Sequence, residues 1–167
     1  MRVPYDHLLA ACAEPLVRIG ERPAVTRLRA EGESIIVDRS DFGPRSKRPG
    51  IPAHDLTFNV ILLSTLFAAE RKTFSNRNVV GFLLAVMVLF FTHVFAFVAS
   101  VKSIYALQLG RWSEVHYGPI ARNFWAGSAH FYRLVGIYAI AFALWWLFRP
   151  DPETVALPRS AKRKRKK

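Results

Sequence analysis

The sequence predicts an all-α integral membrane protein, a small transmembrane helix bundle with three spans and a polar N-terminal segment. Two uncharged or nearly uncharged apolar runs are long enough to cross a bilayer, and basic residues gather in the segments that flank them. The chain therefore divides into three parts. Residues 1–55 form a polar, extracytoplasmic segment, residues 56–148 form the transmembrane helix bundle, and residues 149–167 form a basic cytoplasmic tail.

The two strongest spans are Val79–Ser100 and Ala129–Phe148. The first has no Asp, Glu, Lys or Arg, and at 1.5 Å per residue it reaches across a hydrocarbon core of about 30 Å. The second carries Tyr132, Trp145 and Trp146 near its ends, where amphipathic aromatic rings favour the depth of the headgroups. Both runs are therefore predicted to be transmembrane helices.

The third span is predicted over Leu56–Ala69, which is shorter. A helix of this length covers about 21 Å, less than the hydrocarbon core, so the alternative is a helix that lies in the membrane interface. If it spans, residues 1–55 lie outside and a fourth helix upstream would have carried them across. If it does not span, residues 1–55 are cytoplasmic. We predict a span.

The polar regions carry weaker signals. Ser34–Asp38 and Ala24–Thr26 are rich in β-branched residues, and either is a candidate strand of a small sheet. Phe42–Pro52 contains three prolines and two glycines, which predicts an irregular loop. Residues 101–128 alternate aromatic and basic side chains, which predicts an amphipathic segment on the membrane surface.

Basic residues predict the orientation. The loop Glu70–Asn78 has three Lys/Arg, whereas the much longer loop 101–128 has only three, so the first is predicted to be cytoplasmic and the second external. The tail 149–167 has eight Lys/Arg against two Asp/Glu, which accounts for half of the net charge of +12. Its last six residues are expected to fix topology and bind anionic lipids of the bilayer: Lys162, Arg163, Lys164, Arg165, Lys166 and Lys167. No nucleic acid is expected as a partner.

His93 and Arg133 are the polar side chains deepest in the two strong spans. An ionisable group within the membrane is costly, and it usually faces the interior of the bundle or water. With antiparallel helices, both residues lie toward the outer side of the bilayer. We therefore predict that they approach one another and form a polar spot within the bundle. The alternative is that His93 bonds to a neighbouring helix while Arg133 extends to the interface.

Small residues predict how these helices pack. One stripe runs along the first span and another along the second, and small side chains let membrane helices approach closely. The residues expected at the contact are Gly81, Ala85, Ala96, Gly136 and Ala143.

No catalytic constellation is evident. The sequence has no nucleophile elbow, phosphate-binding loop or dinucleotide fingerprint, and its five histidines lack the spacing of metal ligands. Cys12 is the only cysteine, which excludes an intramolecular disulfide. We therefore expect no enzymatic activity, no metal and no cofactor.

Several phrases of the sequence resemble a known family. ERPAVTRLRAEGESIIVDR, LTFN, THVF and FYRL follow one another in the order found in the accessory membrane proteins associated with exosortase H. The resemblance implies a four-helix bacterial protein with an extracytoplasmic segment between its first two helices. It implies no catalytic role for Cys12. Its partner would be an exosortase-like membrane protein in envelope protein sorting.

The sequence thus predicts a non-enzymatic accessory protein of the bacterial inner membrane. It would be multi-pass with a cytoplasmic C-terminus, and it would act through contacts with another membrane protein. The alternative is a small transporter or channel subunit that uses the polar spot at His93 and Arg133.

Overall fold

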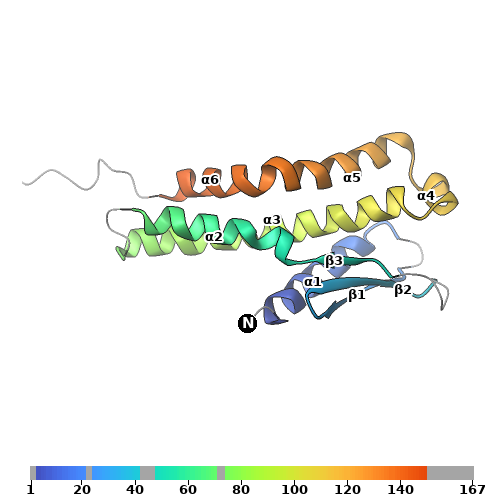
Figure 1. Cartoon of the computed structure of the whole chain (residues 1–167), viewed down its shortest axis with the longest axis horizontal. Coiled ribbons are helices and arrows are strands. Elements are labelled where there is room, and N and C mark those ends of the chain that lie inside the picture. Colours follow the sequence, from blue (N-terminus) through green and yellow to red (C-terminus); the bar gives the residue numbers. More distant parts are fainter. Residues whose placement is uncertain (1–2, 22–23, 42–47, 71–73, 150–167) are drawn as a thin grey trace, which may run out of the picture.

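The computed structural model describes residues 3–21, 24–41, 48–70 and 74–149. Figure 1 shows two long helical rods lying side by side, with a small sheet and one helix packed against one half of them. In chain order the elements are α1 (Val3–Arg18), β1 (Thr26–Glu31), β2 (Ser34–Arg39), β3 (Gly50–Pro52), α2 (His54–Ala68), α3 (Asn76–Leu107), α4 (Arg111–His116), α5 (Pro119–Phe131), the π-helical turn η1 (Tyr132–Gly136) and α6 (Ile137–Phe148).

The first rod is α3, a helix of 32 residues. Ser75 caps its N-terminus, because its side chain accepts a hydrogen bond from the backbone N–H of Asn78. It ends before Gly110, whose φ of +58° allows the chain to turn into α4. The helix is about 48 Å long, so it exceeds the thickness of a hydrocarbon core by several turns.

The second rod is one continuous helix made of α5, η1 and α6, and it runs antiparallel to α3 (Figure 1). Pro119 occupies its first turn, where a missing N–H costs nothing. The five residues of η1 form a π-helical turn, which inserts an extra residue into the helix and shifts the face that follows.

A three-stranded antiparallel sheet with strand order β1-β2-β3 packs against α1 and the second half of α3. β1 and β2 form a hairpin in which Leu28 pairs with Val37, and its turn contains Gly32 with a φ of +61°. Alternate residues of β2 are buried, as expected for a strand with one covered face. Ile35 and Val37 therefore join the core with Ile51 of β3.

The prediction of an all-α bundle with three spans is wrong in two respects. The described residues contain a sheet, and only two of their helices are long and apolar enough to cross a membrane, Asn76–Leu107 and Pro119–Phe148. The helix at Leu56–Ala69 does form as α2, but its 15 residues are too few for a span.

The polar regions are more regular than their sequences suggested. Residues 3–18 form a helix, and a strand occupies the end of the predicted loop Phe42–Pro52, of which residues 42–47 lie outside the described residues. The segment 101–128 is almost entirely helical, because α3 continues past Ser100 to Leu107 before α4 and α5 follow. The sequence predicted an amphipathic surface segment here, and it indicated neither these helices nor the length of α3.

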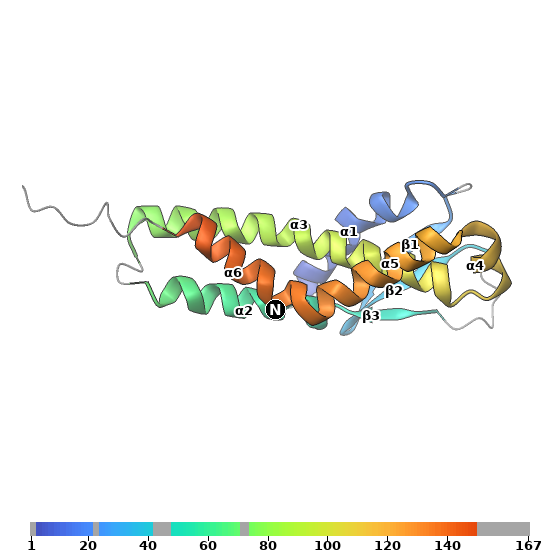
Figure 2. The ribbon, with the colours of Figure 1, turned by 90° about the horizontal axis from the view of Figure 1, so that it is seen from above.

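The buried apolar side chains form two clusters, one after the other along the long axis of the molecule. One contains α1, the sheet and the second half of α3, and the other contains α2, the first half of α3 and α6. Figure 2 shows the same division, with α2 beside α3 and α6 at one end and the sheet at the other.

Large apolar side chains are exposed along the end of the molecule that holds α2 and α6. On α3 they recur at spacings of three and four residues from Val79 to Phe95, and on the second rod they run from Phe131 to Leu147. Each stretch is about 25 Å long. We call these two stretches the apolar belt. Further exposed apolar side chains lie on α1, α2, α4 and α5.

Candidate functional site

His93 lies at the centre of a buried polar network that joins four elements. The side chain is only 1% exposed. Its Nε2–H donates to the Oδ1 of Asn59 on α2 at 2.7 Å, and Asn59 Nδ2 donates to the hydroxyl of Tyr132 in η1 at 3.2 Å. This arrangement leaves His93 Nδ1 as an acceptor for the hydroxyl of Tyr5 on α1.

The network satisfies both ring nitrogens of His93. Unpaired polar groups in an apolar interior are costly, so each partner fixes the position of the next. The contacts hold α1, α2 and η1 against one turn of α3. The network therefore fixes the positions of these helices relative to one another.

Arg133 does not belong to this network. It is exposed, and its neighbour Tyr132 takes the position that faces Asn59. Successive residues of a helix point about 100° apart, so the two side chains cannot share that face. The predicted polar spot thus contains His93 with Tyr132 in place of Arg133. Asn59 and Tyr5 were missed, because only ionisable groups inside the strong spans were considered.

Four of the five predicted packing residues are buried, and the fifth, Ala143, is exposed. A Cβ on Gly81 would lie 2.3 Å from the carbonyl oxygen of Phe148, so the two rods meet closely there. Ala85 and Ala96 are buried. Gly136 is buried too, but a Cβ there would meet Tyr132 of its own helix at 3.2 Å.

Ala143 is exposed, which differs from the prediction. The buried positions of α6 are Ala141 and Leu144. The prediction assumed a regular α-helix, in which Gly136 and Ala143 share one face. The π turn adds one residue to the helix. The buried face after the turn is therefore shifted by one position, and it runs from Ile137 to Leu144 and not from Gly136 to Ala143.

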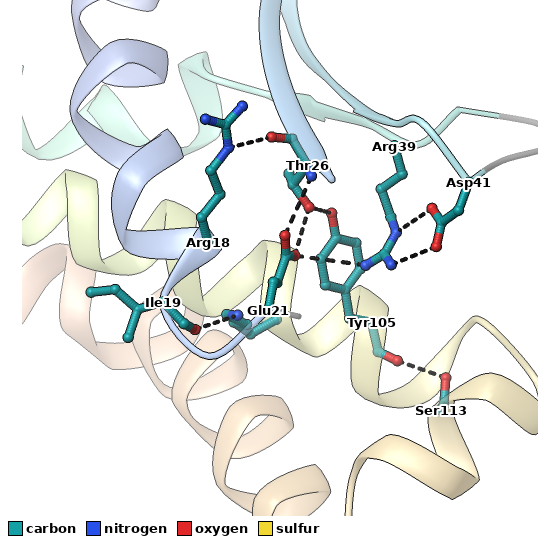
Figure 3. Close-up of polar contacts among 9 residues, drawn as sticks. Arg18, Ile19, Glu21, Thr26, Arg39, Asp41, Tyr105 and Ser113 are labelled. Carbon is teal, nitrogen blue, oxygen red and sulfur yellow. Dashed lines mark hydrogen bonds and ion pairs between the residues drawn. The ribbon is translucent and has the colours of Figure 1, made fainter. Parts of the chain in front are cut away.

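A second polar centre holds the sheet to the end of α3 (Figure 3). Arg39, the last residue of β2, is 5% exposed and donates two hydrogen bonds to Asp41 at 2.9 and 2.8 Å. Its guanidinium lies 3.6 Å from Glu21 and stacks over the rings of Tyr105 and Trp112, at 4.9 and 4.6 Å from their centroids. The hydrogen bonds from Arg39 lower the pKa of the Asp41 carboxyl below its ordinary value.

Thr26 completes this centre. Its hydroxyl donates to Glu21 at 2.6 Å and accepts from the hydroxyl of Tyr105 at 2.7 Å. Lys102 adds a bond from Nζ to the backbone carbonyl of Ile19 at 3.3 Å. Four segments of the chain therefore meet at one place: the end of α1, the edge of the sheet, α3 and α4.

A cationic groove lies between the sheet and the two rods. Its volume is about 690 Å³, and its walls come from residues 48–52, the end of α3 and residues 126–133. Arg48, His130 and Arg133 line it, and no Asp or Glu does among the described lining residues. Arg48 forms an ion pair with Asp38 at 3.2 Å. Arg133 has no acidic partner in the part of the chain that the structure describes.

The structure adds little about the remaining predicted sites. The tail Lys162–Lys167 lies outside the described residues. Cys12 is half-buried on α1. Within the described ranges, no group of three or more His, Cys, Asp or Glu side chains could hold a metal ion.

Comparisons of the chain with protein-family models, curated proteins and solved structures found no match.

Proposed function

We propose that this chain is a non-enzymatic accessory protein of a bacterial inner membrane. Its two rods would cross the bilayer and hold α1 and the sheet in a fixed position at the α4 end of the rods. There the sheet and its neighbouring helices would contact another membrane protein, an exosortase-like enzyme of envelope protein sorting. The observation that carries the proposal is the apolar belt on both rods.

The belt supports a membrane location better than helix length does. A long apolar helix can also form the core of a soluble protein, but then its apolar side chains would be covered. Here large side chains such as Leu83, Phe91 and Leu134 are more than half exposed. A continuous apolar surface of this kind marks a contact with lipid or with another protein. Its length of about 25 Å is close to the hydrocarbon thickness.

The orientation follows from the basic residues. Arg71, Lys72 and Arg77 near the start of α3, together with the tail 149–167, favour a cytoplasmic location for that end of the rods. The α4 end would then lie outside. The C-terminus would be cytoplasmic.

The accessory role rests on rigid attachment of the sheet to the rods. Arg39 and its partners hold the sheet to α3, and the His93 network holds α1 and α2. A fixed extramembrane surface of this kind suits a docking partner. The alternative of a transporter needs a polar path that includes both His93 and Arg133, and the described contacts place these residues in separate surroundings.

Membrane integration is tested by extraction. Membranes that contain the full chain are washed at alkaline pH and then dissolved in detergent. The proposal expects the protein to stay in the pellet until detergent is added. Release by the alkaline wash would contradict it.

The accessory role is tested by co-expression with an exosortase encoded in the same genome. We expect the two proteins to co-purify in detergent, and processing of a sorting substrate to fall when this chain is deleted. A further variant is Arg39→Met, which removes the stacking on Tyr105 and Trp112 that holds the sheet to α3 and α4, and it should reduce co-purification. Full processing without the chain, or a genome with no exosortase gene, would contradict the role.

A further inference from the structure

We propose that the cationic groove binds the phosphate of an anionic phospholipid headgroup. The inference rests on the proposed function in one respect, because it requires the groove to lie at a membrane surface. It adds a ligand class to a site that the accessory role does not need.

The first argument is the charge of the groove. Arg39 is buried and two carboxylates neutralise it, whereas Arg133 and His130 are exposed to whatever enters the groove. The basic side chains of the groove are not all neutralised in this way. Arg133 and His130 have no acidic partner among the described residues, and only Arg48 is paired, with Asp38. A cationic site without its own counter-charge favours an anion from outside, and arginine matches the geometry of phosphate oxygens.

The second argument is the position of the groove along the rods, next to the apolar belt. The apolar belt on α3 ends at Phe95, and the groove begins at Ser100, about 7 Å further along the helix. On the other rod, Arg133 lies in the first turn of the belt, two residues after Phe131, where the belt begins. The groove therefore lies where hydrocarbon gives way to headgroups. A phosphate at Arg133 would leave its acyl chains beside apolar side chains.

The third argument is the space and the donors available. A volume of about 690 Å³ can admit a headgroup from the surface. Ser103 and Gln108 line the same groove and supply a hydroxyl and an amide beside the basic side chains. Figure 1 shows how β3 and α5 flank this half of α3.

The experiment measures lipid binding to the purified full chain in a neutral detergent by native mass spectrometry. Phosphatidylglycerol is titrated as the anionic phospholipid, and phosphatidylcholine as the lipid with the same phosphate but no net charge. We expect phosphatidylglycerol to bind saturably and at least tenfold more tightly. Equal binding of the two lipids would overturn the proposal.

Two matched variants locate the site. Arg133→Gln should weaken phosphatidylglycerol binding by about tenfold, the effect of one lost charge-assisted hydrogen bond. Arg111→Gln makes the same charge change at an exposed arginine of α4 outside the groove, and binding should not change. An equal loss in both variants would indicate general charge attraction and would overturn the proposal. If Arg133→Gln does not fold, the double variant Arg48→Gln, His130→Gln provides the same test.

Inorganic phosphate distinguishes a lipid from a soluble anion. We expect millimolar phosphate to leave phosphatidylglycerol bound, because the acyl chains add apolar contact. Displacement of the lipid by free phosphate would assign the groove to a soluble ligand and overturn the lipid proposal. Failure of the two proposals is distinguishable. A protein released by the alkaline wash contradicts the membrane role, whereas one that stays in the membrane without lipid selectivity contradicts only the groove.

Discussion

At the scale of single residues, a few side chains determine how the helices meet. Gly81 permits a close approach of the two rods, at the carbonyl of Phe148. His93 and Asn59 form a hydrogen bond with one another inside the bundle. Both features follow from ordinary constraints of a packed interior, in which space and hydrogen bonds must be filled.

Gly81→Ala tests the close approach. The added methyl group would meet the Phe148 carbonyl, so the rods must separate, and we expect stability to fall by about 1–3 kcal/mol. Gly127→Ala is the matched control, because a Cβ there meets nothing within 4 Å and alanine favours a helix. Thermal unfolding in detergent, followed by circular dichroism, measures both. Equal stability of the two variants would contradict this packing.

Asn59→Ala tests the polar network. Removal of the amide leaves His93 Nε2–H and the Tyr132 hydroxyl without this partner, so we expect a loss of about 1–2 kcal/mol. Ser64→Ala removes a side chain of the same helix that bonds only to the carbonyl of Val60 among its described contacts, and it should have little effect. The same unfolding measurement applies. A neutral Asn59→Ala would show that the network does not stabilise the bundle.

At the scale of elements, the contact between the sheet and α3 depends on Arg39. Its stacking on Tyr105 and Trp112 ties β2 to two helices, and its hydrogen bonds to Asp41, just after β2, orient the guanidinium. Because Asp41 is partly exposed, solvent weakens this ion pair, and the stacked and buried partners contribute more.

The pH dependence of stability tests this contact. The pKa of Asp41 is lower in the folded chain than in the unfolded chain, so the ionised form stabilises the fold above the ordinary carboxyl pKa. That stability is lost as the pH falls through the ordinary value of about 4 toward the lower folded value. We expect Asp41→Asn to reduce the acid-induced fall of the unfolding midpoint. An unchanged pH profile would contradict the contribution of Asp41.

The sequence predicted those elements whose signal is local. Val79–Ser100 and Ala129–Phe148 lie within the two long helices, and Ser34–Asp38 lies within β2. The extent of α3 was missed because its last two turns are helical without being continuously apolar. The π turn has no local signal in the composition, so the exposure of Ala143 could not be foreseen.

The candidate site was predicted only in part for a similar reason. His93 was singled out as an ionisable residue in an apolar helix. Its partners Tyr5 and Asn59 come from segments 88 and 34 residues away, and only the tertiary fold brings them together. Arg133 was predicted in the right helix, but the neighbouring tyrosine takes the interior position.

At the scale of the whole molecule, two antiparallel rods connect an apolar end to an end that carries the sheet. This division agrees with a protein that places its apolar belt in lipid and presents the sheet beyond it. The central claim is therefore that α3 crosses the bilayer, with its two ends on opposite sides.

Cysteine accessibility in spheroplasts tests that claim most directly. Cys12→Ser removes the native thiol, and Asn76→Cys or Glu114→Cys then places one thiol at an exposed position near either end of α3. A membrane-impermeant maleimide is added before or after lysis. We expect Glu114→Cys to react in intact spheroplasts and Asn76→Cys to react only after lysis. Reaction of both thiols before lysis, or of neither until lysis, would place the two ends on the same side and contradict the membrane-spanning account.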